Sequence, residues 1–185
     1  IKKQVFNKIA AFSLTYKPRL SYEISQIAPS EEDDYFRFSK LQGYVHDMGA
    51  SMQGGVGGHA GLFGTAEDVS KVMQLFLNKG NYANNKIFNS DSFDLFNKRH
   101  FSNNRRGIGF DKPQLDDNVL STCGCVSDES FGHSGFTGTY AWADPKDNLV
   151  YVFLSNRTYP TMRNNMISEY NIRTEVHRLI KEASE

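Results

Sequence analysis

Apolar side chains recur at helical spacing most clearly in the segment that follows a glycine-rich stretch. The stripe consists of Val69, Val72, Met73, Phe76 and Leu77. Thr65 precedes Asp68 by three residues, which is the spacing of a capping box, and Gly80 follows the last turn as a candidate C-cap. The pattern therefore predicts an amphipathic helix between Thr65 and Gly80.

Three other stretches show helical spacing. Residues 1–16 predict the last turns of a helix, which ends before Pro18 because proline disfavours helical backbone in the preceding residue. A short helix is predicted to start near Ser90 or Asp91, and an amphipathic helix is predicted over residues 167–181.

Short apolar runs predict strands in the second half of the chain. They cover residues 107–110, 131–136, 139–143 and 149–154, with turn chemistry at 144–148. Closely linked consecutive strands are most simply antiparallel, so the predicted fold class is α+β, an antiparallel sheet flanked by helices. Residues 19–48 are expected to be irregular, and the acidic cluster 31–34 is expected to be a solvated loop or a helix start, with a cation site as the alternative.

Length and charge limit the function. A chain of 185 residues favours one domain, and 21 basic residues balance 21 acidic ones. This balance gives no electrostatic basis for binding nucleic acid or an anionic membrane as a main role. The longest apolar run is 149–154, so no membrane-spanning segment is predicted.

Cys123 and Cys125 lie two positions apart, and such same-face neighbours on a strand seldom form an unstrained disulfide. They are therefore interpreted as two small strand residues. His133 raises the alternative of a zinc enzyme, which metal analysis would test, but no Cys-x-x-Cys or His-Glu-x-x-His motif supports it. No metal and no cofactor are expected.

Residues 55–60 fit the pattern G-x-G-x-x-A. A dinucleotide site needs a buried strand before this pattern and a helix starting on it, and neither is predicted here. No Gly-Lys-Ser/Thr follows, so a phosphate-binding loop is also excluded. The stretch is interpreted as a glycine loop that passes close to another part of the molecule.

The sequence Gly132-His133-Ser134-Gly135-Phe136 is one residue short of a G-x-S-x-G nucleophile elbow. An elbow also requires a helix directly after the serine, whereas a strand is predicted, so Ser134 is a poor nucleophile of that type. Glycine beside a strand instead lets a ligand lie flat against the sheet edge, where backbone N–H groups can hold an oxyanion.

These features occur in a familiar order. Residues 131–139, 142–145 and 152–157 resemble the C-terminal end of the serine beta-lactamase-like family, which includes class C beta-lactamases, penicillin-binding carboxypeptidases and related esterases. Residues 57–69 resemble its glycine loop and following helix, and 107–110 resemble its Y-G-x-G-[FW] strand. Residues 27–31 and 43–47 resemble a branch in which this domain follows a beta-N-acetylglucosaminidase domain.

The family uses three catalytic motifs. The first, Ser-x-x-Lys, supplies the acylated serine and its base, and no serine of this chain has a lysine three residues later. The second, Tyr-x-Asn, has a literal match at residues 82–84, but it follows the glycine loop instead of preceding it, so Tyr82 is interpreted as a turn residue. Residues 133–135 take the place of the third motif, Lys-Thr-Gly.

The resemblance implies roles for six residues. His133 would orient and polarise the site, and Ser134 would hydrogen-bond a substrate carboxylate or carbonyl. Gly135 completes the third motif, and the backbone N–H of Phe136 would be one oxyanion donor. His59 and Ala60 would border the cleft. The implied partner is a small acyl substrate, and the implied location is periplasmic or extracytoplasmic, at the bacterial cell wall.

The motif order further implies that residues 1–185 form one partial domain, the C-terminal portion of a serine hydrolase domain without its N-terminal strands and nucleophile helix. We expect this portion alone to be inactive and unlabelled by penicillin or fluorophosphonate probes. The strand 149–154 would then expose an edge and pair between chains or swap. The alternative is a non-catalytic module that binds a peptide or glycan in the same cleft.

Overall fold

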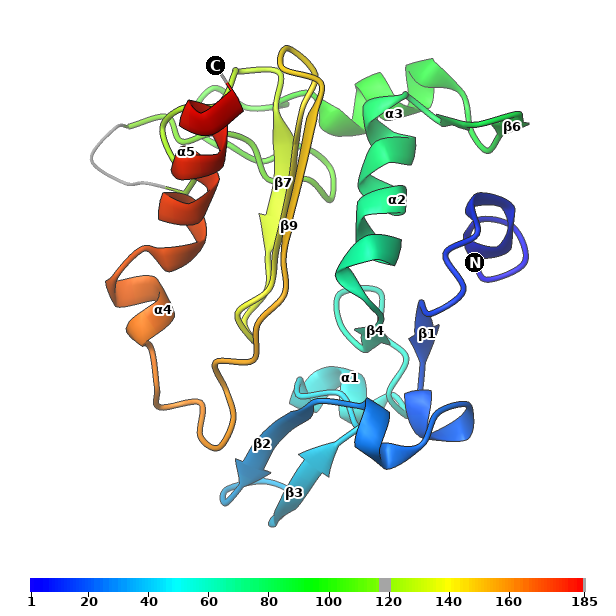
Figure 1. Cartoon of the computed structure of the whole chain (residues 1–185), viewed down its shortest axis with the longest axis vertical. Coiled ribbons are helices and arrows are strands. Elements are labelled where there is room, and N and C mark those ends of the chain that lie inside the picture. Colours follow the sequence, from blue (N-terminus) through cyan, green and yellow to red (C-terminus); the bar gives the residue numbers. More distant parts are fainter. Residues whose placement is uncertain (117–120, 185) are drawn as a thin grey trace.

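The computed structural model describes residues 1–116 and 121–184. Its largest sheet has three antiparallel strands in the order β7-β8-β9: β7 (Phe131–Ser134), β8 (Tyr140–Asp144) and β9 (Leu149–Phe153). The helix α2 (Ala66–Leu77) covers one face and α5 (Ile172–Ser184) covers the other (Figure 1). The predicted α+β class, an antiparallel sheet flanked by helices, is confirmed.

The helix α2 begins as its sequence predicts, whereas its C-cap is Asn78, two residues before the predicted Gly80. The Thr65 hydroxyl accepts a hydrogen bond from the Asp68 N–H at 3.3 Å. At the other end Gly80 has φ +97° and donates its N–H to Leu75 O at 2.9 Å. A residue with a Cβ is strained in this conformation, so glycine is suited to end the helix.

The remaining elements are short. The 3₁₀ helices are η1 (Phe6–Ile9), η2 (Pro18–Leu20) and η3 (Ile24–Gln26), and the other α-helices are α1 (Met48–Met52), α3 (Ser90–Asn97) and α4 (Met166–Glu169). The other strands are β1 (Thr15–Tyr16), β2 (Pro29–Asp33), β3 (Ser39–Gln42), β4 (Leu62–Phe63), β5 (Asn81–Tyr82) and β6 (Asn85–Lys86), paired as β1-β4, β2-β3 and β5-β6. Tyr82 therefore lies in a tight hairpin, as its interpretation as a turn residue predicts.

Strand alternation sorts the core into two faces. Phe131 on β7 packs toward α2 and α3 within a cluster of aromatic rings, Phe76, Phe88, Phe93, Phe110 and Phe131. Tyr140, Trp142 and Tyr151 pack on the opposite face against Val176 of α5. The predicted strands of the sheet are confirmed: β8 has an apolar side for each helix layer, and β7 contributes Phe131 to the α2 side.

The predicted helix over residues 1–16 is wrong. Phe6 and Ile9 are buried, but they lie on a 3₁₀ helix of four residues that ends at Ala10, whose φ is +53°. The chain then extends into β1, which pairs with β4. One short turn is enough to bury both side chains against Leu75 of α2, so the helical spacing does not continue.

The prediction for residues 19–48 is also wrong, because β2 and β3 form a hairpin there. The acidic cluster is neither a solvated loop nor a helix start. Glu31 and Asp33 lie on β2 and are 1% and 3% exposed. Their carboxylates replace water with hydrogen bonds from backbone and side-chain donors, which makes their burial tolerable.

Two further segments differ from expectation. Residues 107–110 form a loop instead of a strand, closed by a hydrogen bond from Gly107 N–H to Phe110 O, and Gly109 has φ +82°. Only Asp111 pairs with the sheet, through an isolated bridge to Gly132. The C-terminal helix is interrupted at Asn171, which has φ +51° and separates α4 from α5.

Cys123 and Cys125 form a disulfide, which corrects their interpretation as free strand residues. Gly124 between them has φ +71°, and the turn brings the two Cα atoms to 5.1 Å. This separation lies in the normal disulfide range, whereas an extended strand would not bring the two sulfurs together. Neither sulfur is a free thiolate for the zinc site considered above.

The outer edge of β9 has no partner strand within residues 1–116 and 121–184. Pairing of this edge between copies of the chain stays a prediction. No helix among the described residues is long and apolar enough to cross a membrane.

Candidate functional site

The free edge of β7 carries the residues singled out in the sequence. Gly132 exchanges two backbone hydrogen bonds with Asp111, at 2.8 and 3.0 Å, on the side away from β8. Because backbone direction alternates along a strand, the N–H group of Ser134 faces the same side, and Phe136 follows in the turn after β7. No strand of the described chain pairs with this side beyond Gly132.

The side chains of His133 and Ser134 point to opposite faces of the sheet. His133 lies opposite Ala141, which packs toward α2, and Ser134 lies opposite Tyr140, which packs toward α5. Both side chains are exposed. The two therefore meet only at the strand edge, and a ligand that uses both must lie along that edge.

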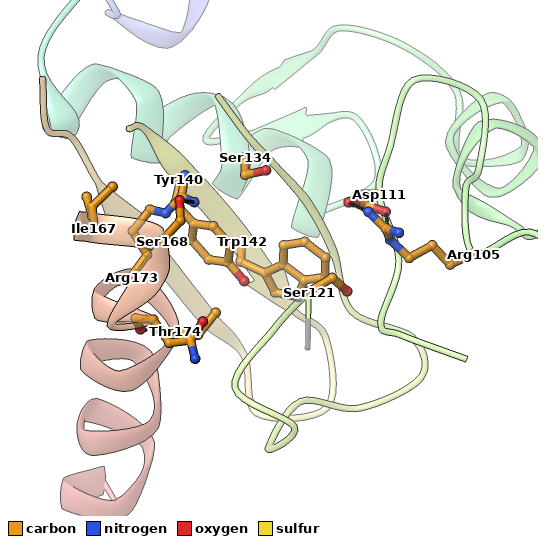
Figure 2. A pocket seen from close by; sticks show the side chains of 11 residues that line it. Arg105, Asp111, Ser121, Ser134, Tyr140, Trp142, Ile167, Ser168, Arg173 and Thr174 are labelled. Atoms are coloured by element: carbon orange, nitrogen blue, oxygen red, sulfur yellow. Dashed lines mark hydrogen bonds and ion pairs between the residues drawn. The ribbon is translucent and has the colours of Figure 1, made fainter. Parts of the chain in front are cut away.

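Ser134 lines a pocket of about 340 Å³ on the α5 side of the sheet (Figure 2). Tyr140 and Trp142 form part of its wall, and Arg173 and Ser168 approach from the helices. Arg173 donates from Nη1 to Thr139 O at 3.3 Å, which ties α5 to the β7–β8 turn. Burial raises the pKa of the Tyr140 phenol, so that group remains protonated at ordinary pH.

The turn after β7 is built on glycine. A Cβ on Gly135 would lie 2.1 Å from Thr139 Oγ1, and Gly138 has φ +105°. Gly135 N–H donates to Thr139 O at 2.8 Å, which closes the turn. A larger residue at the third-motif position would therefore have to displace the Thr139 side chain, independent of any ligand.

Phe136 is held from two sides while its backbone N–H stays free. The Arg157 guanidinium lies 4.3 Å from the ring centroid, and the His46 ring lies at 5.4 Å. Arg157 Nε also donates to Phe136 O at 2.7 Å. The N–H of Phe136 makes no hydrogen bond to any described residue. An N–H without a partner among the described residues, beside a carbonyl that Arg157 holds, can serve as one donor of an oxyanion site.

His46 is positioned in turn by the β2–β3 hairpin. Glu31 is almost fully buried, and its carboxylate contacts His46 Nε2 at 3.0 Å and accepts from Tyr35 Oη at 2.9 Å. The same carboxylate accepts the Met162 N–H at 3.0 Å, which joins the hairpin to the segment after β9. The Glu31 carboxylate is thus the link between the hairpin and the Phe136 turn, through His46.

The glycine loop forms a separate part of the candidate site. His59 Nε2 lies 2.9 Å from Asp47 Oδ1, and Ala60 O accepts the Gly57 N–H at 3.1 Å. A hydrogen bond from the Ala50 N–H, and to a smaller extent the one with His59, holds the pKa of Asp47 below its usual range. No hydrogen bond or ion pair joins His59 or Ala60 to β7 within the described residues. Their place at the border of the cleft stays a prediction.

Arg106 contacts the candidate site although the sequence analysis passes over it. Its Nη1 lies 2.6 Å from His133 Nε2. The neighbouring Arg105 binds the Asp111 carboxylate through two hydrogen bonds, at 2.7 and 3.0 Å, and so fastens this segment beside β7. A charged residue directly before the Gly107-Ile108-Gly109 loop was the available signal.

The described residues contain no group of three or more His, Cys, Asp or Glu side chains arranged to hold a metal ion. The chemistry that the site itself presents is hydrogen-bond donation from a strand edge, next to a histidine and an arginine. This suits an anionic or carbonyl oxygen of a ligand.

Comparison with known proteins identifies the family of the chain. The Beta-lactamase family model matches residues 17–172. Proteins named "Putative D-alanyl-D-alanine carboxypeptidase" from Salmonella agona (strain SL483) and Salmonella typhi are each 34% identical over 134 residues, which is 71% of this chain and 31% of theirs. The chain thus spans about a third of the length of these relatives.

A solved structure titled "Crystal structure of putative beta-lactamase from Bacteroides dorei DSM 17855" covers 85% of this chain and 43% of its own, with TM-score 0.46 and 10% identity. The family match extends over most of the chain and includes both the glycine loop and the third-motif strand. The chain belongs to the beta-lactamase family of serine hydrolases.

Proposed function

We propose that this chain supplies the binding edge of a serine hydrolase that opens amide or ester bonds through an acyl-enzyme. The observation that carries the proposal is the N–H of Phe136, which has no acceptor among residues 1–116 and 121–184, in a turn that Arg157 holds. The names of the Salmonella relatives support a peptide that ends in D-alanyl-D-alanine as the substrate class, and beta-lactams as the related one.

The proposed reaction has two steps. A serine hydroxyl attacks the scissile carbonyl, the carbonyl oxygen becomes an oxyanion, and the C–N bond breaks as the amine leaves with a proton. Water then attacks the ester, releases the acid and restores the serine. The Phe136 N–H stabilises the oxyanion in both steps, and Ser134 and His133 orient the substrate beside it.

The acylated serine and its lysine are assigned to a part of the full-length protein outside these residues, because no Ser-x-x-Lys occurs in the 185 residues. The chain alone is then expected to be inactive. Incubation with a penicillin or fluorophosphonate probe should leave its intact mass unchanged. A stoichiometric adduct on any serine would refute this assignment.

A location outside the cytoplasm is part of the same proposal. The Cys123–Cys125 disulfide supports it, since disulfides persist mainly in oxidising compartments. Alkylation of the protein in intact cells, before and after reduction, tests it: thiols that react without reduction would argue against an oxidising location.

Amide NMR of the chain tests the binding role. Addition of an N-acyl-D-alanyl-D-alanine peptide should shift the Ser134 and Phe136 amide signals, and a Gly135→Val variant should lose this response because a Cβ there meets Thr139. Lys79→Met is the control, since Lys79 is an exposed residue after α2 that pairs with Asp94 of α3. Shifts scattered away from β7 would contradict the proposal.

The absence of Ser-x-x-Lys from the chain favours one alternative, a non-catalytic module that binds a peptide or glycan in the same cleft. The same NMR experiment with a β-1,4-linked N-acetylglucosamine oligomer separates them. A response at Ser134 and Phe136 to the glycan and none to the acyl peptide would favour the module.

A further inference from the structure

A second pocket lies where the turn after β1, the end of the β2–β3 hairpin, the end of α1 and the strand β4 meet. Its volume is about 590 Å³, which is within the usual range of small-molecule sites. None of its lining residues belongs to β7, β8 or β9. The residues that matter for its chemistry are Lys17, Arg19, Leu20, Tyr44, Gly54 and Phe63.

The second pocket is positively charged. Its lining includes two cations, Lys17 and Arg19, and no aspartate or glutamate. Within residues 1–116 and 121–184, neither cation forms an ion pair or a side-chain hydrogen bond. The charge of about +2 is therefore not neutralised by a carboxylate of the wall, and the pocket favours an anionic ligand.

Arg19 is held in a defined orientation. A Cβ on Gly43 would lie 2.5 Å from Arg19 Cγ, so the stem of the arginine occupies the space that a side chain at position 43 would need. The Arg19 guanidinium carbon lies 4.7 Å from the centroid of the Tyr44 ring. This contact uses the flat face of the guanidinium and leaves the N–H groups at its edge available to a ligand.

Lys17 lies on another side of the pocket, beside a turn of two glycines. Its backbone is left-handed, with φ +50°, which is strained for a residue with a Cβ. A Cβ on Gly54 would lie 3.9 Å from Lys17 Nζ, and one on Gly55 would lie 3.9 Å from Lys17 Cε. The ammonium therefore lies next to backbone that carries no side chain, on the wall of the pocket.

The rest of the lining is largely apolar. Leu20 is 82% exposed and Tyr44 is 51% exposed, and Val45 and Phe63 continue the apolar wall. An inorganic ion would leave this surface in water, whereas a ligand with an apolar ring would cover it and gain hydrophobic stabilisation. The lining thus suits a ligand that combines an anionic group with a ring.

We propose that the second pocket binds an organic anion: a carboxylate or phosphate group lies against Lys17 and Arg19, and an apolar ring attached to it packs on Leu20 and Phe63. The proposed function does not enter this inference, because no residue of β7 lines the pocket. The molecule would then have two ligand sites, one at the strand edge and one in the second pocket.

NMR titration of the ¹⁵N-labelled 185-residue chain tests this proposal with four probes. Benzoate or phenyl phosphate should shift the amide signals of Gly43, Gly54 and Gly55 to saturation, and saturation by only one of them identifies the anionic group. Benzamide, which has the shape of benzoate without its charge, should bind on the order of tenfold more weakly, and acetate, which has no ring, should also bind more weakly. Added salt should weaken the binding of benzoate.

Two variants test the cations themselves. Lys17→Met and Arg19→Met each remove one charge and keep an unbranched stem, so each should weaken the binding of benzoate or phenyl phosphate several-fold, and the double variant should weaken it on the order of tenfold or more. Lys86→Met is the matched control, because Lys86 is an exposed lysine of β6 outside the pocket, and it should bind as the wild type does.

Three results would overturn the proposal. They are the absence of saturable shifts with both benzoate and phenyl phosphate, equal affinities for benzoate and benzamide, and a double variant that binds as tightly as the wild type. The comparison of benzoate with benzamide uses the wild type alone, so it decides the question even where a variant does not fold. Saturable shifts confined to residues 131–137 would also overturn the proposal, since they would place the anion at the β7 edge.

Discussion

The sheet with its helices and the β2–β3 hairpin both contain buried side chains, but different forces hold them. The sheet packs on α2 through aromatic rings whose centroids lie 5.0–6.3 Å apart. The hairpin has two nearly buried carboxylates, Glu31 and Asp33, surrounded by N–H and O–H donors. Apolar burial is insensitive to pH, whereas a hydrogen-bonded carboxylate contributes stability only while it is ionised.

This difference bears on function, because the candidate site lies where the two regions meet. Phe136 lies in the turn that follows β7 of the sheet, and its ring contacts His46, whose Nε2 lies against Glu31 of the hairpin. The sheet sets the position of the β7 edge, and the polar hairpin supports one side of the turn that carries the free N–H.

Truncation of Phe131 should give the largest loss of stability. Phe131 is fully buried. Its ring centroid lies 5.0 Å from that of Phe93 and 5.3 Å from that of Phe110. Phe131→Ala leaves a cavity in a rigid aromatic cluster, so the free energy of unfolding in urea should fall by about 3–5 kcal/mol. Phe96→Ala is the control, because Phe96 is 45% exposed. Equal losses in the two variants would show that the aromatic cluster is not the main support of the sheet.

The layer between the sheet and α5 contains a buried histidine, His177 of α5. Its ring stacks on Tyr151, with 4.6 Å between the ring centroids. Burial, and next the charge of Lys181, lowers its pKa to about 4. Tyr140, Asp144 and Asp147 also face it. A depressed pKa means that stability is full above the unfolded value of about 6.5 and is lost as the pH falls toward 4. The loss should be about 3 kcal/mol at most.

His177→Phe removes this titration. Urea unfolding at about pH 7 and pH 4.5 gives the free energy of unfolding of wild type and variant. As the pH falls, the free energy of unfolding of the wild type should decrease more than that of the variant. His100→Phe provides the control, since His100 is exposed. A difference that is constant with pH would contradict the burial of a neutral His177.

Asp33 should give a smaller effect in a lower pH range. Burial alone would raise its pKa, but hydrogen bonds from the Phe36 N–H, the Arg37 side chain and the Tyr35 N–H lower it to about 2. Asp33→Asn should therefore cost about 2 kcal/mol near neutral pH. The contribution is present above the unfolded pKa of 3.8 and is lost as the pH falls toward 2.

Thermal unfolding at about pH 6, 4 and 3 measures this effect, and the cost of Asp33→Asn should shrink by about half at pH 3. Glu32→Gln, at the exposed neighbouring position, should have little effect at any of these values. A cost that does not change with pH would mean that the Asp33 carboxylate does not hold the hairpin through its charge.

The same comparison explains what the sequence can predict. The helix α2 and the strands β7, β8 and β9 follow from periodic burial, because each presents an apolar side to a neighbouring layer. The hairpin was missed because Glu31 and Asp33 look like solvent-facing residues until their donors are known. Those donors include Met162 N–H, which lies 131 residues away from Glu31.

The candidate site was also predictable only in part. The motif at 132–136 identifies the β7 edge, because its glycines lie at the end of a predicted strand. The Arg106–His133 contact spans 27 residues, and the loop at 107–110 that creates it was predicted as a strand. The Cys123–Cys125 pairing was missed because it depends on the turn at Gly124.

Photo-crosslinking tests most directly the claim that the β7 edge binds an acyl substrate without being acylated. The chain is irradiated with an N-acyl-D-alanyl-D-alanine peptide that carries a diazirine on its acyl group, then digested and mapped by mass spectrometry. We predict crosslinks concentrated in residues 131–137, reduced by excess unlabelled peptide, and no ester on any serine. Crosslinks spread over the surface, or an acyl ester on a serine of this chain, would contradict the account.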